Sequence, residues 1–470
     1  MCSITHPTYF YLCTTMIHSN DTICALATPN GVGAIAMIRV SGAKSLEIVS
    51  AIFSKSLHDK ASHTAHFGTV KNEQNEVIDE VLISVFAEGK SFTGEESAEI
   101  ACHASPYIQQ QIIQALLQKG CRLAEPGEYT MRAFMNGKLD LSQAEAVADL
   151  IASQSKSAHD IALKQLRGGF SNELKELREK LIHFASLVEL ELDFAEEDVE
   201  FADRKELKQL VTDVLSYINR LAKSFELGNA IKNGVPVAIV GAPNTGKSTL
   251  LNQLLGEDRA IVSNIAGTTR DVIEETLNIE GILFRLIDTA GIREGAEEIE
   301  AMGIERSKEK IKQAQVVLCL ADTSLPSSLK EVVNWATEIE TEFPDKKVLV
   351  LANKQDISQE KVESCEKEYI SISAKEGIGM EILREKLVEL VTGDFNLAND
   401  TIVSNIRHYD ALVRTAVSLE KAKFDLDNNI SADFVAMDIR QAMYDLGTIT
   451  GDISTDDLLG NIFSKFCIGK

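Results

Sequence analysis

The stretch "GAPNTGKSTLLNQLL", residues 241–255, decides the fold of the central part of this chain. It follows the apolar segment "VAIV" and carries Gly241, Gly246, Lys247 and Ser248 at P-loop spacing, directly before a helical pattern. Glycines let several backbone amides approach phosphate oxygens, and a helix N-terminus adds partial positive charge. The spacing therefore predicts a nucleotide site in which Lys247 contacts the β- and γ-phosphates and Ser248 binds Mg²⁺.

Three segments downstream predict the rest of a GTP site. Asp288 in "DTAG" ends an apolar strand, where it would hold the metal through water, and the amide of Gly291 would sense the γ-phosphate. "NKQD", 353–356, ends another strand with an aspartate that can accept two hydrogen bonds from guanine, a donor pair that adenine lacks. "SAK", 373–375, fits the loop whose amide meets the guanine oxygen. With the switch segment "SNIAGTTRD", the predicted GTP contacts are Asn244, Thr245, Gly246, Lys247, Ser248, Thr249, Ser263, Asn264, Ile265, Ala266, Gly267, Thr268, Thr269, Asp288, Thr289, Ala290, Gly291, Asn353, Lys354, Asp356, Ser373, Ala374 and Lys375.

Two positions separate this site from a simple switch protein. Ile292 follows "DTAG" and has no hydrogen-bonding group to orient the attacking water, so another residue must do this. Asn244 lies within the P-loop, where its oxygen and loop carbonyls could hold a monovalent cation beside the phosphates. The alternative is that Asn244 only shapes the loop, and the residues alone do not decide between the two.

Composition limits the classes of protein. At 470 residues with 44% hydrophobic residues, the chain should fold into several domains. No apolar run reaches the ~20 residues of a membrane span, so a membrane-spanning segment is excluded. No membrane partner is expected. A net charge of −24 disfavours a general nucleic-acid wrapper, so any RNA contact must be local or shared with a more basic partner. Eight scattered cysteines without a C-x-x-C pair fit a reducing, cytoplasmic location.

Periodicity predicts an α/β domain inserted into a helical one. Residues 1–20 lack the charged start of a signal peptide, and we interpret them as a disordered extension or a mis-called start. Residues 21–137 favour short strands with one helix, "YIQQQIIQALLQKG", in a small α+β domain. Residues 138–230 and 395–470 are helical, and residues 231–394 alternate buried strands and helices, which indicates a parallel, doubly wound sheet.

These motifs, with "PGEYTMRAFMNGKLDLSQAEAVADLI" at 126–151 and the terminal "FCIGK", resemble the MnmE (TrmE) family of tRNA modification GTPases. The resemblance runs from about Asn20 to Lys470. It implies an N-terminal folate-binding domain that mediates homodimerisation, a helical domain and an inserted G domain activated by K⁺ when two G domains meet. It also implies a heterotetramer with the flavoprotein MnmG (GidA). That complex adds a carboxymethylaminomethyl or aminomethyl group to carbon 5 of the wobble uridine in certain tRNAs, using 5-formyl- or 5,10-methylene-tetrahydrofolate.

The resemblance also assigns residues by position. Glu300 would orient the attacking water, and Glu300, Cys467 and Lys247 are the predicted catalytic residues. "CHAS", residues 102–105, stands where family members often read "GHGG", so a backbone approach that depends on glycine is in question there. The implied ligands are Asn244, Ser263, Ile265 and Thr268 for K⁺, Ser248 and Thr269 for Mg²⁺, and Arg39, Glu99, Lys138 and Lys470 for folate.

The terminal "FCIGK" leaves three possibilities for Cys467: prenylation, an inert thiol, or a group delivered to a site elsewhere. Gly469 is not aliphatic and Lys470 is not a usual specificity residue, which disfavours prenylation. The resemblance favours the third, with the tail reaching the folate site. Two alternative functions are a ribosome-assembly or RNA-binding switch GTPase and a dynamin-like GTPase at membranes. The first class lacks "CIGK" and is commonly basic, and the second needs a basic amphipathic stretch that is missing here.

Overall fold

The computed structural model divides into two compact units. The first comprises Met1–Ala148, Gln165–Arg178 and Met443–Lys470, and the second comprises Asp149–Lys164 and Glu179–Ala442. Each unit is described by itself below. The structure describes residues 21–193, 204–258, 275–287, 308–325, 327–358, 367–397, 399–428 and 430–469.

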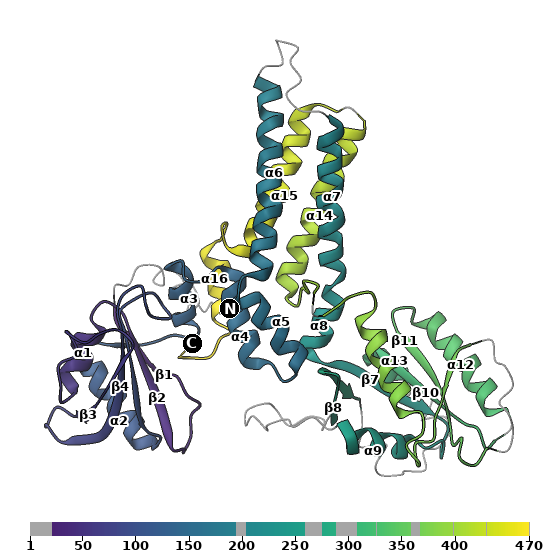
Figure 1. The fold of residues 1–470 in the computed structure, drawn as a ribbon, viewed down its shortest axis with the longest axis horizontal. Helices are drawn as coiled ribbons and strands as arrows, with labels where there is room; N and C mark the ends of the chain where they lie inside the picture. Colours follow the sequence, from purple (N-terminus) through teal and green to yellow (C-terminus); the bar gives the residue numbers. More distant parts are fainter. Residues whose placement is uncertain are drawn as a thin grey trace, which may run out of the picture. The chain divides into compact units, whose positions relative to one another are not determined.

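The first unit contains a six-stranded sheet with the strand order β3-β4-β5-β2-β1-β6. Its neighbouring strands are antiparallel, except that β6 runs parallel to β1. Alternate residues such as Ile38, Ile83 and Ile100 are fully buried and pack against helices α1 and α2, which lie along the sheet in Figure 1. The elements are β1 (Ile23–Leu26), β2 (Ile35–Ser41), α1 (Ser45–Ile52), β3 (Thr64–Lys71), β4 (Val77–Phe86), β5 (Ser97–His103), α2 (Pro106–Gln118), β6 (Arg122–Leu123) and α3 (Glu128–Met135).

The α+β character of this region is confirmed, but the expectation of a single helix is wrong. The predicted helix is α2, and α1 and α3 are present as well. Each of these has eight residues, about two turns, so its apolar pattern is too short to distinguish from a loop. Strand β5 was also not predicted, because "SAEIACH" has few of the large β-branched or aromatic residues that favour strands.

The second unit contains the α/β domain. Its sheet has the order β12-β11-β10-β7-β9-β8 and is parallel apart from the antiparallel pair β8 and β9. The predicted parallel, doubly wound sheet is therefore confirmed, with one antiparallel edge strand in addition. Its strands are β7 (Val235–Gly241), β8 (Glu275–Ile279), β9 (Ile282–Leu286), β10 (Val316–Asp322), β11 (Lys347–Asn353) and β12 (Tyr369–Ser371).

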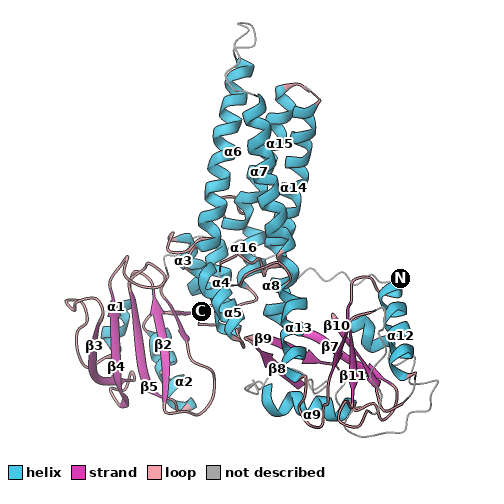
Figure 2. Cartoon of the chain, turned by 45° about the vertical axis from the view of Figure 1, so that its right-hand side comes forward, coloured by secondary structure: helices cyan, strands magenta, loops and turns pink. Residues whose placement is uncertain are grey.

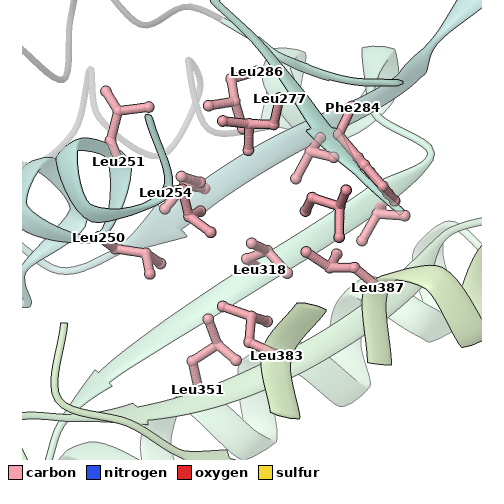
Figure 3. Close-up of a cluster of buried hydrophobic side chains, with 14 of the residues drawn as sticks. Leu250, Leu251, Leu254, Leu277, Phe284, Leu286, Leu318, Leu351, Leu383 and Leu387 are labelled. Carbon is pink, nitrogen blue, oxygen red and sulfur yellow. The ribbon is translucent and has the colours of Figure 1, made fainter. Parts of the chain in front are cut away.

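Helices cover both faces of this sheet. On one face, Leu250 and Leu383 pack with Leu318 in the cluster of Figure 3. On the other face, Val332 packs with Val317. Successive residues of β10 thus point to opposite cores, which explains why all seven residues of the strand are buried. The covering helices are α9 (Lys247–Asp258), α12 (Ser328–Glu342) and α13 (Met380–Thr392).

A helical bundle makes up the rest of the second unit. Its long helices lie side by side in Figures 1 and 2, and each contributes buried apolar residues, among them Phe184, Val211, Leu412 and Val435. The α/β domain is inserted between α8 and α14, as predicted. Nowhere in the described part of the chain is a helix both long and apolar enough for a bilayer. Of the remaining helices, α7 (Arg204–Lys223), α8 (Phe225–Asn233) and α14 (Ile406–Asp427) belong to the second unit and α16 (Asp456–Phe463) belongs to the first. The boundary between the units falls within α4 (Leu141–Ala152), α5 (Lys156–Leu166), α6 (Gly169–Asp193) and α15 (Ala432–Thr450).

Candidate functional site

The predicted P-loop joins the end of β7 to the first turn of α9. Two of its glycines have positive φ angles that other residues rarely adopt, 157° at Gly241 and 99° at Gly246. Space is tight as well. A Cβ on Gly241 would lie 2.7 Å from the carbonyl oxygen of Leu320, and one on Gly246 would collide with Nδ2 of Asn353. Both glycines are therefore required by the backbone and by their neighbours.

Asn353 connects three of the predicted motifs. It ends β11, and the residue is 2% exposed. Its Nδ2 donates to the carbonyl of Thr245 in the P-loop at 2.9 Å, and its Oδ1 accepts from the amide of Ala374 at 2.9 Å. A single buried carboxamide thus holds the P-loop, "NKQD" and "SAK" in one place, although 108 residues separate Asn353 from Thr245.

Asp356 is the exposed carboxylate that the sequence assigns to guanine recognition. Ser373 Oγ donates to its Oδ1 at 2.6 Å. This hydrogen bond is the main reason that the pKa of Asp356 lies below its ordinary value, and the charges of Lys375 and Lys354 add to the effect. The carboxylate is therefore ionised at neutral pH, as an acceptor for two guanine donors must be.

Lys247 and Ser248 open helix α9. The Lys247 ammonium donates to the carbonyls of Gly241 and Ala242 at 2.9 and 2.8 Å, so it lies over the loop that would hold the phosphates. Ser248 is exposed in the same first turn, which suits a hydroxyl ligand of Mg²⁺. Thr249, the next residue, is also exposed.

Asn244 has the left-handed backbone, with φ of 61°. Asparagine tolerates this conformation better than most residues, so a role in shaping the loop has a direct structural basis. The side chain is exposed beside the phosphate-binding turn, which leaves its carboxamide accessible to a cation. The structure is thus compatible with both interpretations of Asn244.

Several predicted residues lie outside the described part of the chain. They include the proposed water-orienting glutamate, the switch segment and the last residue of the tail: Ser263, Asn264, Ile265, Ala266, Gly267, Thr268, Thr269, Asp288, Thr289, Ala290, Gly291, Glu300 and Lys470.

In the first unit, the predicted folate contacts Arg39 and Glu99 face each other across β2 and β5. Arg39 Nε and Nη2 donate to Glu99 Oε1 at 2.9 and 2.8 Å. The guanidinium carbon lies 5.7 Å from the ring centre of Phe92 and 5.6 Å from that of Tyr129, whose hydroxyl donates to the Arg39 carbonyl at 2.8 Å. Phe92 and Tyr129 were not predicted, and the pairing of distant segments that places them is not visible in the sequence.

Lys138 supports the loop that carries Phe92. Its ammonium donates to the carbonyl of Gly89 at 2.9 Å, and Asn136 Nδ2 donates to the carbonyl of Thr93 at 2.8 Å. Residues just after α3 therefore hold both ends of this short loop. Lys138 therefore lies near Arg39, because the loop that it holds carries Phe92, whose ring contacts the Arg39 guanidinium.

The C-terminal tail packs on this neighbourhood within the first unit. The Gly127 amide donates to the Cys467 carbonyl at 3.3 Å. Gly469 has φ of 92°, and a Cβ there would collide with the carbonyl of Leu26 at the end of β1. Cys467 is exposed. Since Gly127 precedes the helix that carries Tyr129, the tail lies close to the elements that position Arg39.

The "CHAS" segment is tied to its surroundings. The Cys102 side chain is buried, and burial raises the pKa of its thiol to about 11, with the charge of Asp79 adding to the rise. His103 Nδ1 lies 2.8 Å from Asp79 Oδ1, and the Gly33 amide donates to the Ala104 carbonyl at 3.2 Å. The segment therefore joins β4, β5 and the loop before β2 through His103, which "GHGG" also contains, and through the backbone of Ala104.

Two family models match the chain: "GTP-binding protein TrmE N-terminus" over residues 22–138 and "MnmE helical domain" over residues 141–467. The relative named tRNA modification GTPase MnmE from Flavobacterium johnsoniae is 53% identical and covers 96% of this chain and 100% of its own length. The chain belongs to the MnmE family. The relatives of the same name from Cytophaga hutchinsonii and Bacteroides thetaiotaomicron are 52% and 50% identical over 97% and 96% of this chain and 99% and 100% of their own lengths.

Membership of the MnmE family confirms the resemblance and the fold class of the three parts. The chain is accordingly a tRNA modification GTPase by family. Among solved structures, the G domain of the T. maritima FeoB iron transporter is 25% identical over 33% of this chain and 97% of its own length. Its TM-score of 0.24 is too low to define a shared fold.

Proposed function

We propose that this GTPase modifies carbon 5 of the wobble uridine in tRNA, adding a carboxymethylaminomethyl or aminomethyl group. It would act as a homodimer together with a flavoprotein of the MnmG (GidA) type. A tetrahydrofolate, as the 5-formyl or 5,10-methylene form, would supply the one-carbon unit. The support comes from family membership and from the two sites that the described residues build.

The main support for GTP binding is the buried Asn353, which holds three GTP motifs together. In this site, Asp356 would accept the guanine donors while Lys247 leaves the loop carbonyls for the phosphates. Mg²⁺ would be held by Ser248 and Thr269 and would neutralise phosphate charge. Glu300 would orient the attacking water, since Ile292 has no group to do so.

The folate part rests on the first unit. Arg39 is fixed between two aromatic rings and paired with Glu99, each side chain being 24% exposed, so both ions remain accessible to a polar ligand. The tail that carries Cys467 packs beside this site. A ribosome-assembly switch would have no use for a chain end held at such a place, and this favours the modification enzyme.

The K⁺ part is tested by GTP turnover in potassium and sodium buffers of equal ionic strength. We expect turnover to be at least about tenfold faster in potassium, because a cation beside the phosphates replaces an arginine finger. The matched variants are Asn244→Gly and Asn244→Ala. Glycine keeps the left-handed backbone but lacks the carboxamide, so it should bind nucleotide normally and lose the potassium response. A wild-type rate indifferent to the cation overturns the K⁺ proposal.

A further inference from the structure

The loop after β10 braces the guanine-recognition motif. Asp322, whose side chain is 6% exposed, accepts from the Lys354 ammonium at 2.6 Å through Oδ2. Its other oxygen, Oδ1, accepts from the amide and the hydroxyl of Ser324 at 3.0 and 2.6 Å. Hydrogen bonds therefore fix both carboxylate oxygens of Asp322.

Thr323, the next residue of that loop, binds the backbone of the same motif. The amide and hydroxyl of Thr323 both donate to the carbonyl of Asn353, at 3.0 and 2.7 Å. The loop therefore contacts two consecutive residues of "NKQD", Asn353 through its carbonyl and Lys354 through its ammonium.

Lys354 itself has an unusual backbone conformation. Its φ is 68°, in the left-handed region, which costs a residue other than glycine roughly 1 kcal/mol or more. This conformation makes the chain turn sharply between the end of β11 and Asp356. An interaction that fixes the far end of the Lys354 side chain offsets the cost and keeps the turn in one conformation.

We propose that Asp322 is a positioning residue for guanine recognition, acting through Lys354 to fix the turn that presents Asp356 to the base. The inference rests on the proposed nucleotide site and adds a residue that positions its guanine-binding carboxylate. Asp356 is exposed, and Ser373 holds one of its oxygens. Its alignment with two donors on a ligand therefore depends on the backbone that precedes it.

Misalignment of Asp356 changes the selectivity between guanine and hypoxanthine, whereas a general loss of stability does not. Guanine offers an N1 proton and a 2-amino group to Asp356, whereas hypoxanthine offers only the N1 proton. A carboxylate that is no longer aligned loses more with guanine than with hypoxanthine, so the ratio of the two affinities narrows. Weaker phosphate binding or partial unfolding would reduce both affinities by the same factor.

The test measures binding of mant-GDP and mant-IDP to the full chain with the variants Asp322→Asn, Thr323→Val, Lys354→Met and Asp322→Asn/Lys354→Met. Asp322→Asn should weaken mant-GDP binding by about tenfold and mant-IDP binding clearly less. In the Lys354→Met background, Asp322→Asn should have no further effect. The control is Asp345→Asn, which removes an exposed carboxylate paired with Lys346 at 2.9 Å in the same domain.

The outcomes distinguish a failure of the proposed nucleotide site from a failure of the role proposed for Asp322. If the wild-type chain fails to bind mant-GDP, the proposed nucleotide site itself is wrong. If it binds and Asp322→Asn behaves like Asp345→Asn, Asp322 has no positioning role. Equal losses for both nucleotides, or additive effects in the double variant, also overturn the inference. Should Asp322→Asn not fold, Lys354→Met decides, because it removes the same ion pair from its other end and should narrow the same ratio.

Discussion

At the residue scale, Ser373 and Asp356 make a testable pair. The Ser373 hydroxyl lowers the pKa of Asp356, so the carboxylate is lost only when the pH falls through a value below the ordinary aspartate range of about 3.9. Ser373→Ala should weaken mant-GDP binding about fivefold at neutral pH, because the orienting hydrogen bond is gone. The ratio of the affinities of the wild type and Ser373→Ala should stay constant between pH 5.5 and 8 in fluorescence titrations, since Asp356 is ionised throughout and the terminal phosphate of the nucleotide titrates alike with both proteins.

Ser371→Ala is the matched control, because Ser371 is exposed two residues away. A ratio of the two affinities that changes as the pH is lowered from 8 to 5.5 would contradict this assignment. So would a Ser373→Ala protein that binds as tightly as the control.

Single residues also show where prediction from the sequence ends. The glycines and charged residues of "GKS", "NKQD" and "SAK" were predictable because each motif is a short run whose chemistry requires those side chains. The position of Tyr129 was not, because its hydroxyl meets a carbonyl 90 residues away. Asp322 reads as the ordinary end of a buried strand, and its role depends on Lys354, 32 residues further along.

At the element scale, a network of ion pairs joins the start of β1, β6 and helix α3. Glu128, 7% exposed, lies 2.6 Å from Arg122 and 2.9 Å from Arg132, and Asp21 pairs with both arginines. Burial raises the pKa of Glu128, but hydrogen bonds from Arg122, the Glu125 amide and Arg132 outweigh it, so the pKa is lower than usual. Glu128 therefore stabilises the fold above its unfolded pKa of about 4.3, and this contribution disappears as the pH falls through the lower folded value.

Replacing Glu128 by glutamine should destabilise α3 by about 3 kcal/mol, because the buried Arg132 and the partly exposed Arg122 both lose a charged partner. Hydrogen exchange of the α3 amides measures this loss locally. At each pH between 6 and 8, these amides should exchange faster in the variant than in the wild type, and the ratio of the two rates should be the same throughout this range. Glu125→Gln is the control, since that side chain is exposed in the same loop. If α3 exchanges at the wild-type rate in Glu128→Gln, the network does not hold this helix.

Elements also differ in how well the sequence predicts them. Buried strands such as β10, with its run "VVLCLAD", and helix α2 with its glycine stop carry a strong local pattern. The short helices α1 and α3 and strand β5 do not, because pairing with β2 and β4 places β5 rather than its own composition. The sequence therefore predicts the GTP site, whose motifs are short runs at strand ends, better than the surroundings of Arg39, which come from segments far apart in the chain.

At the scale of the whole molecule, the two candidate sites belong to different compact units. GTP motifs lie in the second unit, and Arg39, Glu99 and the tail lie in the first. A net charge of −24 gives the chain little general affinity for a phosphate backbone, so tRNA binding would be local or shared with the flavoprotein partner. A variant in the tail of the first unit should therefore leave GTP turnover in the second largely intact.

Cys467 offers the sharpest test of this separation. Its thiol is exposed on a tail that packs against Gly127, whereas Cys24, Cys102, Cys121 and Cys319 are buried. Cys467→Ser should abolish tRNA modification, measured by mass spectrometry of digested nucleosides after incubation with the flavoprotein, folate and tRNA. GTP turnover should stay within about twofold of the wild type, because the nucleotide motifs belong to the other compact unit. Ile468→Val, at an exposed neighbouring position, should retain both activities. Modified uridine in the Cys467→Ser reaction at the wild-type level would show that the thiol is inert, and parallel losses of both activities would show that the tail acts on the nucleotide site.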